Sequence, residues 1–201
     1  MNALLTIVNS GMNQHAKLRQ MKLCWQSMSF DQRLDLLRDD DYTLFCSVCR
    51  QGYMEISHWL FNVCPEAERF LMLQAQNHAA FRWACHDGYQ VLAEWLLSLC
   101  HNEQGYVAMC RADNDDALRW ACENERDSTV KWLLNIYSDR LAIDVLDQVL
   151  MSFQGLLVSW PYLNVDQQIK LFRSGLGLDL LLNDIQSKAD LDFYYFQSCL
   201  V

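Results

Sequence analysis

The chain has 201 residues, and 52% of them are hydrophobic, a share too high for a disordered polypeptide. Its formal net charge of −9, with no run of Lys or Arg, argues against binding to nucleic acid or an anionic membrane surface, because such binding requires a basic face. With only two prolines and seven glycines, the composition favours helix over sheet.

The N-terminal segment, residues 1–40, is predicted to form capping helices. Its first residues lack the basic region of a secretory signal. No stretch of the chain approaches the roughly 18 apolar residues of a membrane-spanning helix. We therefore expect a cytoplasmic, monomeric protein that does not enter a membrane.

Residues 41–137 contain an internal repeat. Three segments, 43–61, 79–97 and 116–134, align without gaps at spacings of 36 and 37 residues. Tryptophan recurs in register in all three (Trp59, Trp95 and Trp132), and so does cysteine (Cys49, Cys85 and Cys122). The tetrapeptide Arg82-Trp83-Ala84-Cys85 returns as Arg119-Trp120-Ala121-Cys122.

Each unit has the pattern of a helix, a turn and a second helix. Apolar residues lie three and four positions apart in both helices, and Gly52 and Gly88 suit a turn with positive φ. Asp41, Asn77 and Asn114 precede the first helix of their units, where a left-handed backbone or an N-cap is tolerated. The stretches between units, which begin near residues 30, 66 and 103, each suit a short helix.

These units resemble the ankyrin repeat family. Residues 84–89, Ala-Cys-His-Asp-Gly-Tyr, followed by Leu-Ala-Glu-Trp-Leu-Leu at 92–97, are similar to the family's Ala-Ala-x-x-Gly-His and Val-Val-x-Leu-Leu-Leu pattern. The period exceeds the family's usual value of about 33, and the additional residues fall between helix pairs. The resemblance implies an all-α solenoid with helical N- and C-terminal caps, and short helices in place of the family's β-hairpin fingers.

The resemblance also implies a concave surface that binds a protein or peptide partner. A partner with a basic surface would complement the net charge of the chain. The residues carried over to this surface are Tyr42, Arg50, Gln51, His78, Arg82, His86, Asp87, Asp115, Arg119, Glu123 and Asn124.

No catalytic residue, metal site or cofactor is predicted. Cys46-x-x-Cys49 lacks a second pair of zinc ligands, and Cys49 is explained by its repeat position as a small buried residue. The acidic groups at 39–41 and 113–116 are explained by helix capping. Trp59, Trp95 and Trp132 are expected in the core, whereas Trp83 and Trp120 suit either packing between repeats or exposed binding anchors.

Residues 138–201 are expected to form a degenerate repeat, at about 154–172, and C-terminal capping helices. Two alternatives to a simple interaction module stay open. One is an enzyme whose site lies near residues 160–190. The other is a bacterial or viral effector that acts on host proteins in the host cytosol.

Overall fold

The computed structural model describes residues 3–139, and this part of the chain is all-α, with nine helices and no strand. The degenerate repeat, the C-terminal caps beyond residue 139 and the alternative catalytic region lie outside the described residues. The helices are α1 (Ala3–Val8), α2 (Gln14–Gln26), α3 (Phe30–Arg50), α4 (Met54–Val63), α5 (Glu66–Asp87), α6 (Gln90–Ser98), α7 (Glu103–Cys110), α8 (Ala112–Glu123) and α9 (Asp127–Asp139).

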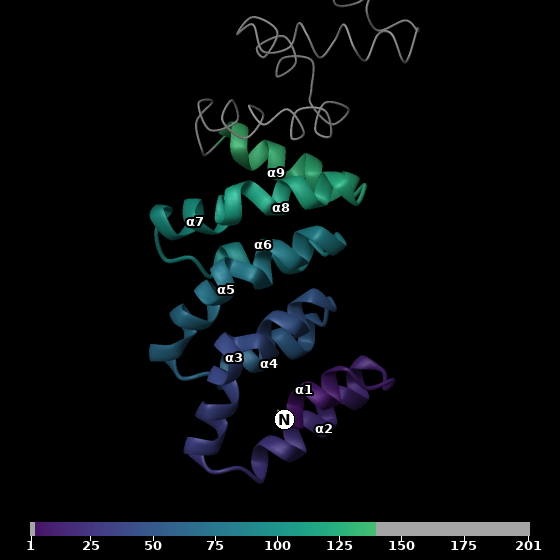
Figure 1. Cartoon of the computed structure of the whole chain (residues 1–201), viewed down its shortest axis with the longest axis vertical. Helices are drawn as coiled ribbons and strands as arrows, with labels where there is room; N and C mark the ends of the chain where they lie inside the picture. Colours follow the sequence, from purple (N-terminus) through teal and green to yellow (C-terminus); the bar gives the residue numbers. More distant parts are fainter. Residues whose placement is uncertain (1–2, 140–201) are drawn as a thin grey trace, which may run out of the picture. The chain divides into compact units, whose positions relative to one another are not determined.

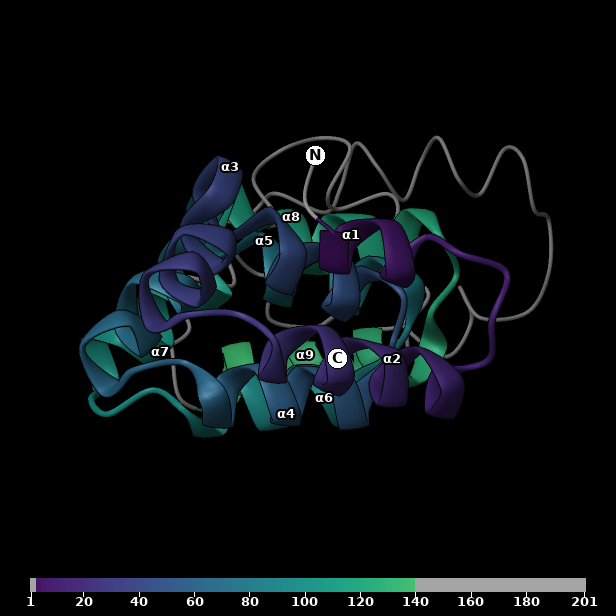
Figure 2. The same ribbon diagram turned by 90° about the horizontal axis from the view of Figure 1, so that it is seen from below.

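The chain divides into two compact units, Met1–Thr129 and Val130–Val201. Helices α1 to α8 belong to the first unit (Figure 1). They form two layers, with α1, α3, α5 and α8 in an inner layer and α2, α4 and α6 in an outer layer (Figure 2). Within the inner layer α5 packs against both α3 and α8, so it is the central element of the unit.

Three helices of the inner layer are bent by three consecutive residues with positive φ. These junctions are residues 40–42 in α3, 76–78 in α5 and 113–115 in α8. The left-handed backbone predicted at Asp41, Asn77 and Asn114 is confirmed, with φ values of 50, 55 and 56°. A short helix precedes each junction, as predicted, and no strand occurs there among the described residues.

Polar side chains connect each junction to the next one within the first unit. The prediction that the carboxylate of Asp41 caps its own helix is wrong, because this carboxylate accepts a 2.6 Å hydrogen bond from the backbone N–H of Gln76. The amide of Asn77 in turn donates to Asp113 at 3.1 Å. The three junctions therefore form a hydrogen-bonded edge along the first unit.

The turns from α3 to α4 and from α5 to α6 follow the predicted glycine geometry. Gly52 and Gly88 lie in these turns, with φ values of 69 and 81°. Glu125 takes the equivalent position between α8 and α9, with a φ of 55°. The ring of Tyr89 lies over Gly52, so close that a Cβ on this glycine would come within 2.6 Å of the ring. The side chain of Arg126 covers Gly88 in the same way.

The core contains the cysteines that the repeat positions predicted to be buried. Cys49 and Cys85 are fully buried, and Cys122 is 3% exposed. The prediction for Trp59 and Trp95 needs correction, because both are only half-buried. Trp59 packs edge-on against Trp25, and Trp95 stacks on His58, so both rings lie between outer-layer helices, where one side meets solvent.

Candidate functional site

The predicted partner surface divides into buried and accessible residues. Four of its members are buried: Tyr42, His78, Arg82 and Asp115 are 6, 7, 8 and 5% exposed. Tyr42, His78 and Asp115 each occupy the third left-handed position of a junction. A buried side chain cannot contact a partner while the junction is folded, so these four belong to the internal framework of the surface.

Tyr42 belongs to a polar cluster between α3 and α5. Its hydroxyl donates to Glu68 at 2.5 Å, and the guanidinium of Arg38 pairs with the same carboxylate. The hydrogen bonds from Arg38 and Tyr42 lower the pKa of Glu68 to about 2. Burial, followed by the bond to Glu68, raises the pKa of Tyr42 to about 12. Arg38 and Tyr42 therefore hold Glu68 in its ionised form.

Arg82 is the most highly connected residue of the predicted surface. It donates to the carbonyls of Gln76 at 2.8 Å and Asn77 at 3.0 Å, which satisfies the backbone of its own junction. It also pairs with Asp113 at 2.8 Å and Asp116 at 2.9 Å on α8. Arg82 thus stabilises the bend of α5 and joins it to α8.

His78 and Asp115 serve their junctions in a similar way. The Nδ1 atom of His78 lies 3.0 Å from the carbonyl of Leu73, and burial lowers the pKa of this histidine. Asp115 pairs with Arg111 at 3.4 Å, one helical turn before it. The two residues hold the ends of the bent helices rather than presenting polar groups to solvent.

The accessible part of the predicted surface surrounds two tryptophans of the inner layer. Trp83 on α5 and Trp120 on α8 are both half-buried, and their ring centroids lie 5.0 Å apart with an interplanar angle of 34°. His86 contacts both rings edge-on, at 5.2 and 5.6 Å. The guanidinium of Arg50, on α3, lies 4.0 Å from the centroid of Trp83. We call Arg50, Trp83, His86 and Trp120 the tryptophan strip.

Polar side chains of both signs border the tryptophan strip. His86 Nδ1 lies 2.9 Å from the carboxylate of Asp87, and Glu123 is exposed at the end of α8. Arg119 is 40% exposed and pairs with Asp116, on the side of Trp120 nearer the junctions. The remaining predicted residues, Gln51 and Asn124, are half-buried at the helix ends. The arrangement combines a rigid aromatic surface with a polar rim.

The thiols near the strip do not form a reactive centre. Cys85 is fully buried, and burial raises its pKa well above the usual value of 9.0. Burial likewise raises the pKa of Cys46 to about 12 and that of Cys64 to about 11. Among residues 3–139, no group of three His, Cys, Asp or Glu side chains has the geometry to hold a metal ion. Burial therefore keeps these three thiols protonated at neutral pH.

The spatial link between Arg50 and Trp83 could not be found from the sequence pattern. The repeated Arg-Trp-Ala-Cys tetrapeptide placed both tryptophans at one repeat position, but Arg50 and Trp83 occupy different positions in their units. Their contact depends on how α3 packs beside α5. The same holds for His86, which reaches both rings only because α5 lies next to α8.

The chain matches no protein-family model, no curated protein and no solved structure. No helix within residues 3–139 combines the length and the apolar character needed to cross a lipid bilayer.

Proposed function

We propose that this chain is an ankyrin-like helical-repeat module that binds a protein or peptide partner through the inner layer of its first unit. Recurring backbone geometry supports the repeat: junctions and turns with positive φ return at the spacing of the sequence repeat. The Ala-Cys pairs, the buried cysteines and the paired helices recur in the same register. On this proposal the inner layer forms the concave recognition face.

The observation that carries the proposal is the tryptophan strip. Tryptophan and arginine are enriched among the residues that dominate binding energy at protein interfaces. Trp83 and Trp120 are held by ring contacts from two helices, so binding would cost little side-chain entropy. Half-burial leaves part of each ring accessible while the rest is packed. This combination is expected of an anchor surface.

The borders of the strip indicate the kind of partner. One face of Trp83 is already covered by Arg50, so the partner meets a surface that combines aromatic and cationic groups. The carboxylates of Asp87 and Glu123 provide acceptors for basic side chains of the partner. We infer a peptide or loop with an apolar residue at its centre and at least one basic residue. No catalytic step and no cofactor are part of this proposal.

The test begins with a random peptide library displayed against the full chain. Peptides that are enriched are then measured by fluorescence anisotropy against the wild type and Trp83→Ala. An anchor residue contributes about 2 kcal/mol or more, so the variant should bind about 30-fold more weakly. Trp83→Phe should retain most of the affinity, because it keeps an aromatic ring in the stack.

Val91→Ala is the matched control, because Val91 is 70% exposed on the outer-layer helix α6. It should bind as the wild type does. Circular dichroism and urea unfolding show whether each variant is folded before affinities are compared. If the selected peptides bind Trp83→Ala and the wild type equally, the strip is not the recognition surface and the proposal is wrong.

A further inference from the structure

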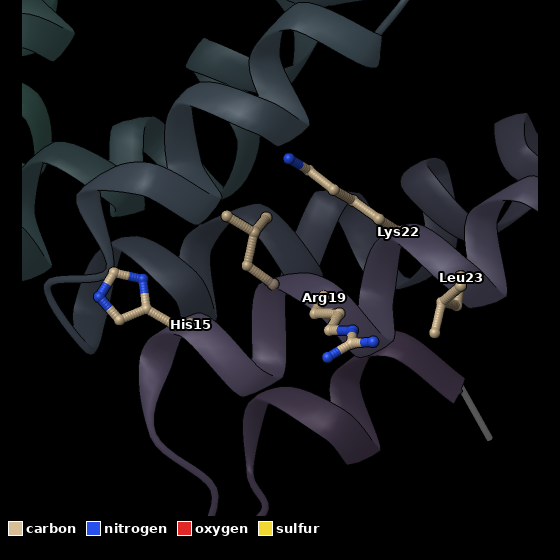
Figure 3. Close-up of a pocket in the computed structure, with 5 residues that line it drawn as sticks. His15, Arg19, Lys22 and Leu23 are labelled. Atoms are coloured by element: carbon tan, nitrogen blue, oxygen red, sulfur yellow. The ribbon is translucent and has the colours of Figure 1, made fainter.

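A second surface feature lies on α2, away from the tryptophan strip. In the outer layer α2 packs against α4, through contacts such as the edge-on pair of Trp25 and Trp59. The outward side of α2 carries a hollow of about 320 Å³ (Figure 3). The residues that line it all come from this one helix: His15, Leu18, Arg19, Lys22 and Leu23. A hollow on a single helix suits the side chains of another helix better than an enclosed small molecule.

The hollow concentrates positive charge in an acidic chain. Its lining includes Arg19 and Lys22 and no Asp or Glu, whereas the whole chain has a formal net charge of −9. His15, Arg19 and Lys22 follow one another at spacings of four and three residues, so they form a stripe about 10 Å long on one side of α2. Within the described residues Arg19 and Lys22 form no ion pair, and His15 lies 3.3 Å from Glu55.

The same stripe includes apolar surface. Leu23 is 58% exposed, and Leu18 is half-buried. A cationic row bordered by leucines complements an amphipathic helix that carries carboxylates beside its apolar stripe. A helix docked on this side would cover the exposed leucine and the cations of α2.

We propose that the hollow on α2, defined by Arg19, Lys22, His15 and two leucines, docks an acidic amphipathic helix of a partner protein. A short helix would meet chiefly this stripe, so its carboxylates would lie closer to Arg19 and Lys22 than to most acidic residues of the chain. An extended anionic surface would instead be repelled by the net negative charge of the whole chain. The proposal is independent of the function assigned to the tryptophan strip.

The test uses two labelled helical peptides of the same length and leucine pattern. One carries Glu at positions spaced four and three apart beside the leucines, and the other carries Lys at the same positions. Fluorescence anisotropy with the full chain should detect the Glu peptide and not the Lys peptide. Lys22→Glu should weaken binding at least tenfold, and raising the salt concentration should weaken the wild-type complex.

Lys131→Glu is the matched control, because it makes the same charge change at an exposed position on α9. It should leave the affinity within about twofold, because Lys131 does not line the hollow. Leu23→Ser tests the apolar contact, with Val91→Ser as its control, and only the former should weaken binding. Equal binding of the two peptides, or equal loss in both charge variants, would overturn the proposal.

The competing interpretation is that the hollow binds the phosphate groups of a lipid surface. Vesicles of phosphatidylserine and phosphatidylcholine are tested by co-sedimentation with the wild type and Lys22→Glu. If the vesicles bind through Lys22 and the Glu peptide does not bind, the hollow recognises a membrane surface and the helix proposal is wrong. Inorganic phosphate at millimolar concentration should not displace the peptide, because it makes no contact equivalent to the leucines.

Discussion

Arg82 and Asp116, 34 residues apart in the chain, form a buried ion pair in which Nη1 lies 2.9 Å from Oδ2. Both side chains are less than one-tenth exposed. Because Arg82 also donates to two carbonyls of its own junction, the pair joins the bend of α5 to α8. Trp83 follows Arg82 in the chain and Arg119 pairs with Asp116, so the ion pair lies next to the proposed recognition surface.

Replacing Arg82 by Ala should destabilise the first unit strongly. The substitution leaves the buried carboxylate of Asp116 with Arg119 as its remaining partner and exposes two junction carbonyls without donors. Breaking a buried pair from one side costs about 3 to 5 kcal/mol. The free energy of unfolding is measured by urea denaturation. Asp113→Asn serves as the control and should cost less than about 1 kcal/mol, since Asp113 is half-exposed.

The Glu68 cluster should make stability dependent on acidic pH. The pKa of Glu68 is lowered from 4.5 to about 2, so the folded chain takes up this proton at a lower pH than the unfolded chain does. The contribution of Glu68 is therefore complete above about pH 4.5 and is lost as the pH falls towards 2. Urea midpoints measured from pH 7 to pH 2.5 should fall less steeply for Glu68→Gln than for the wild type.

Glu66→Gln is the control for the pH experiment, because Glu66 is exposed on the same helix. Its profile should follow that of the wild type. A Glu68→Gln profile with the wild-type slope below pH 4.5 would show that the bonds from Arg38 and Tyr42 do not hold this carboxylate in solution.

The turn glycines should tolerate substitution unequally. Gly52→Ala places a methyl group against the ring of Tyr89 at a residue with φ 69°, and should cost about 2 kcal/mol or more. Gly11→Ala is the matched control, because nothing lies within 4 Å of its Cβ. Thermal unfolding compares the two. Equal midpoints would contradict the packing of Tyr89 on Gly52.

Glu125 offers the opposite test, because it adopts φ 55° at the position that glycine holds in the two preceding turns. Glu125→Gly removes the cost of a left-handed backbone for a residue with a side chain, about 1 kcal/mol. The free energy of unfolding of Glu125→Gly should rise by less than this 1 kcal/mol, because glycine also increases the conformational entropy of the unfolded chain. A clear loss of stability, measured by the urea midpoint, would contradict the assigned backbone geometry.

The cysteines of the first unit should differ in reactivity. Cys49 and Cys85 are fully buried and burial raises the pKa of both thiols, whereas Cys24 is half-buried. Alkylation by iodoacetamide at pH 8, followed by mass spectrometry of individual peptides, should modify Cys24 first. Cys49 and Cys85 should react far more slowly, because burial shields both sulfur atoms from the reagent and disfavours their thiolate forms. In urea the three rates should become similar.

Local patterns in the sequence were sufficient for several parts of the described fold. The low content of Pro and Gly and the apolar spacing of three and four predicted helices, and residues 3–139 contain only helices as regular secondary structure. Gly52 and Gly88 indicated the turns, and Asp41 and Asn77 the left-handed junctions, because these residue types lower the cost of positive φ. Backbone preference is a property of a residue and its neighbours, so a sequence repeat reveals it.

Side-chain partners depended on the tertiary structure. Asp41 was expected to cap its own helix but accepts from Gln76, and Arg82 was expected at a partner surface but is buried against Asp116. The sequence by itself determined the helical units, their turns and the recurrence of Trp83 and Trp120. Only the packing of neighbouring helices within the first unit decided which polar groups are desolvated and which rings meet, because burial and pairing depend on contacts between residues about 35 positions apart.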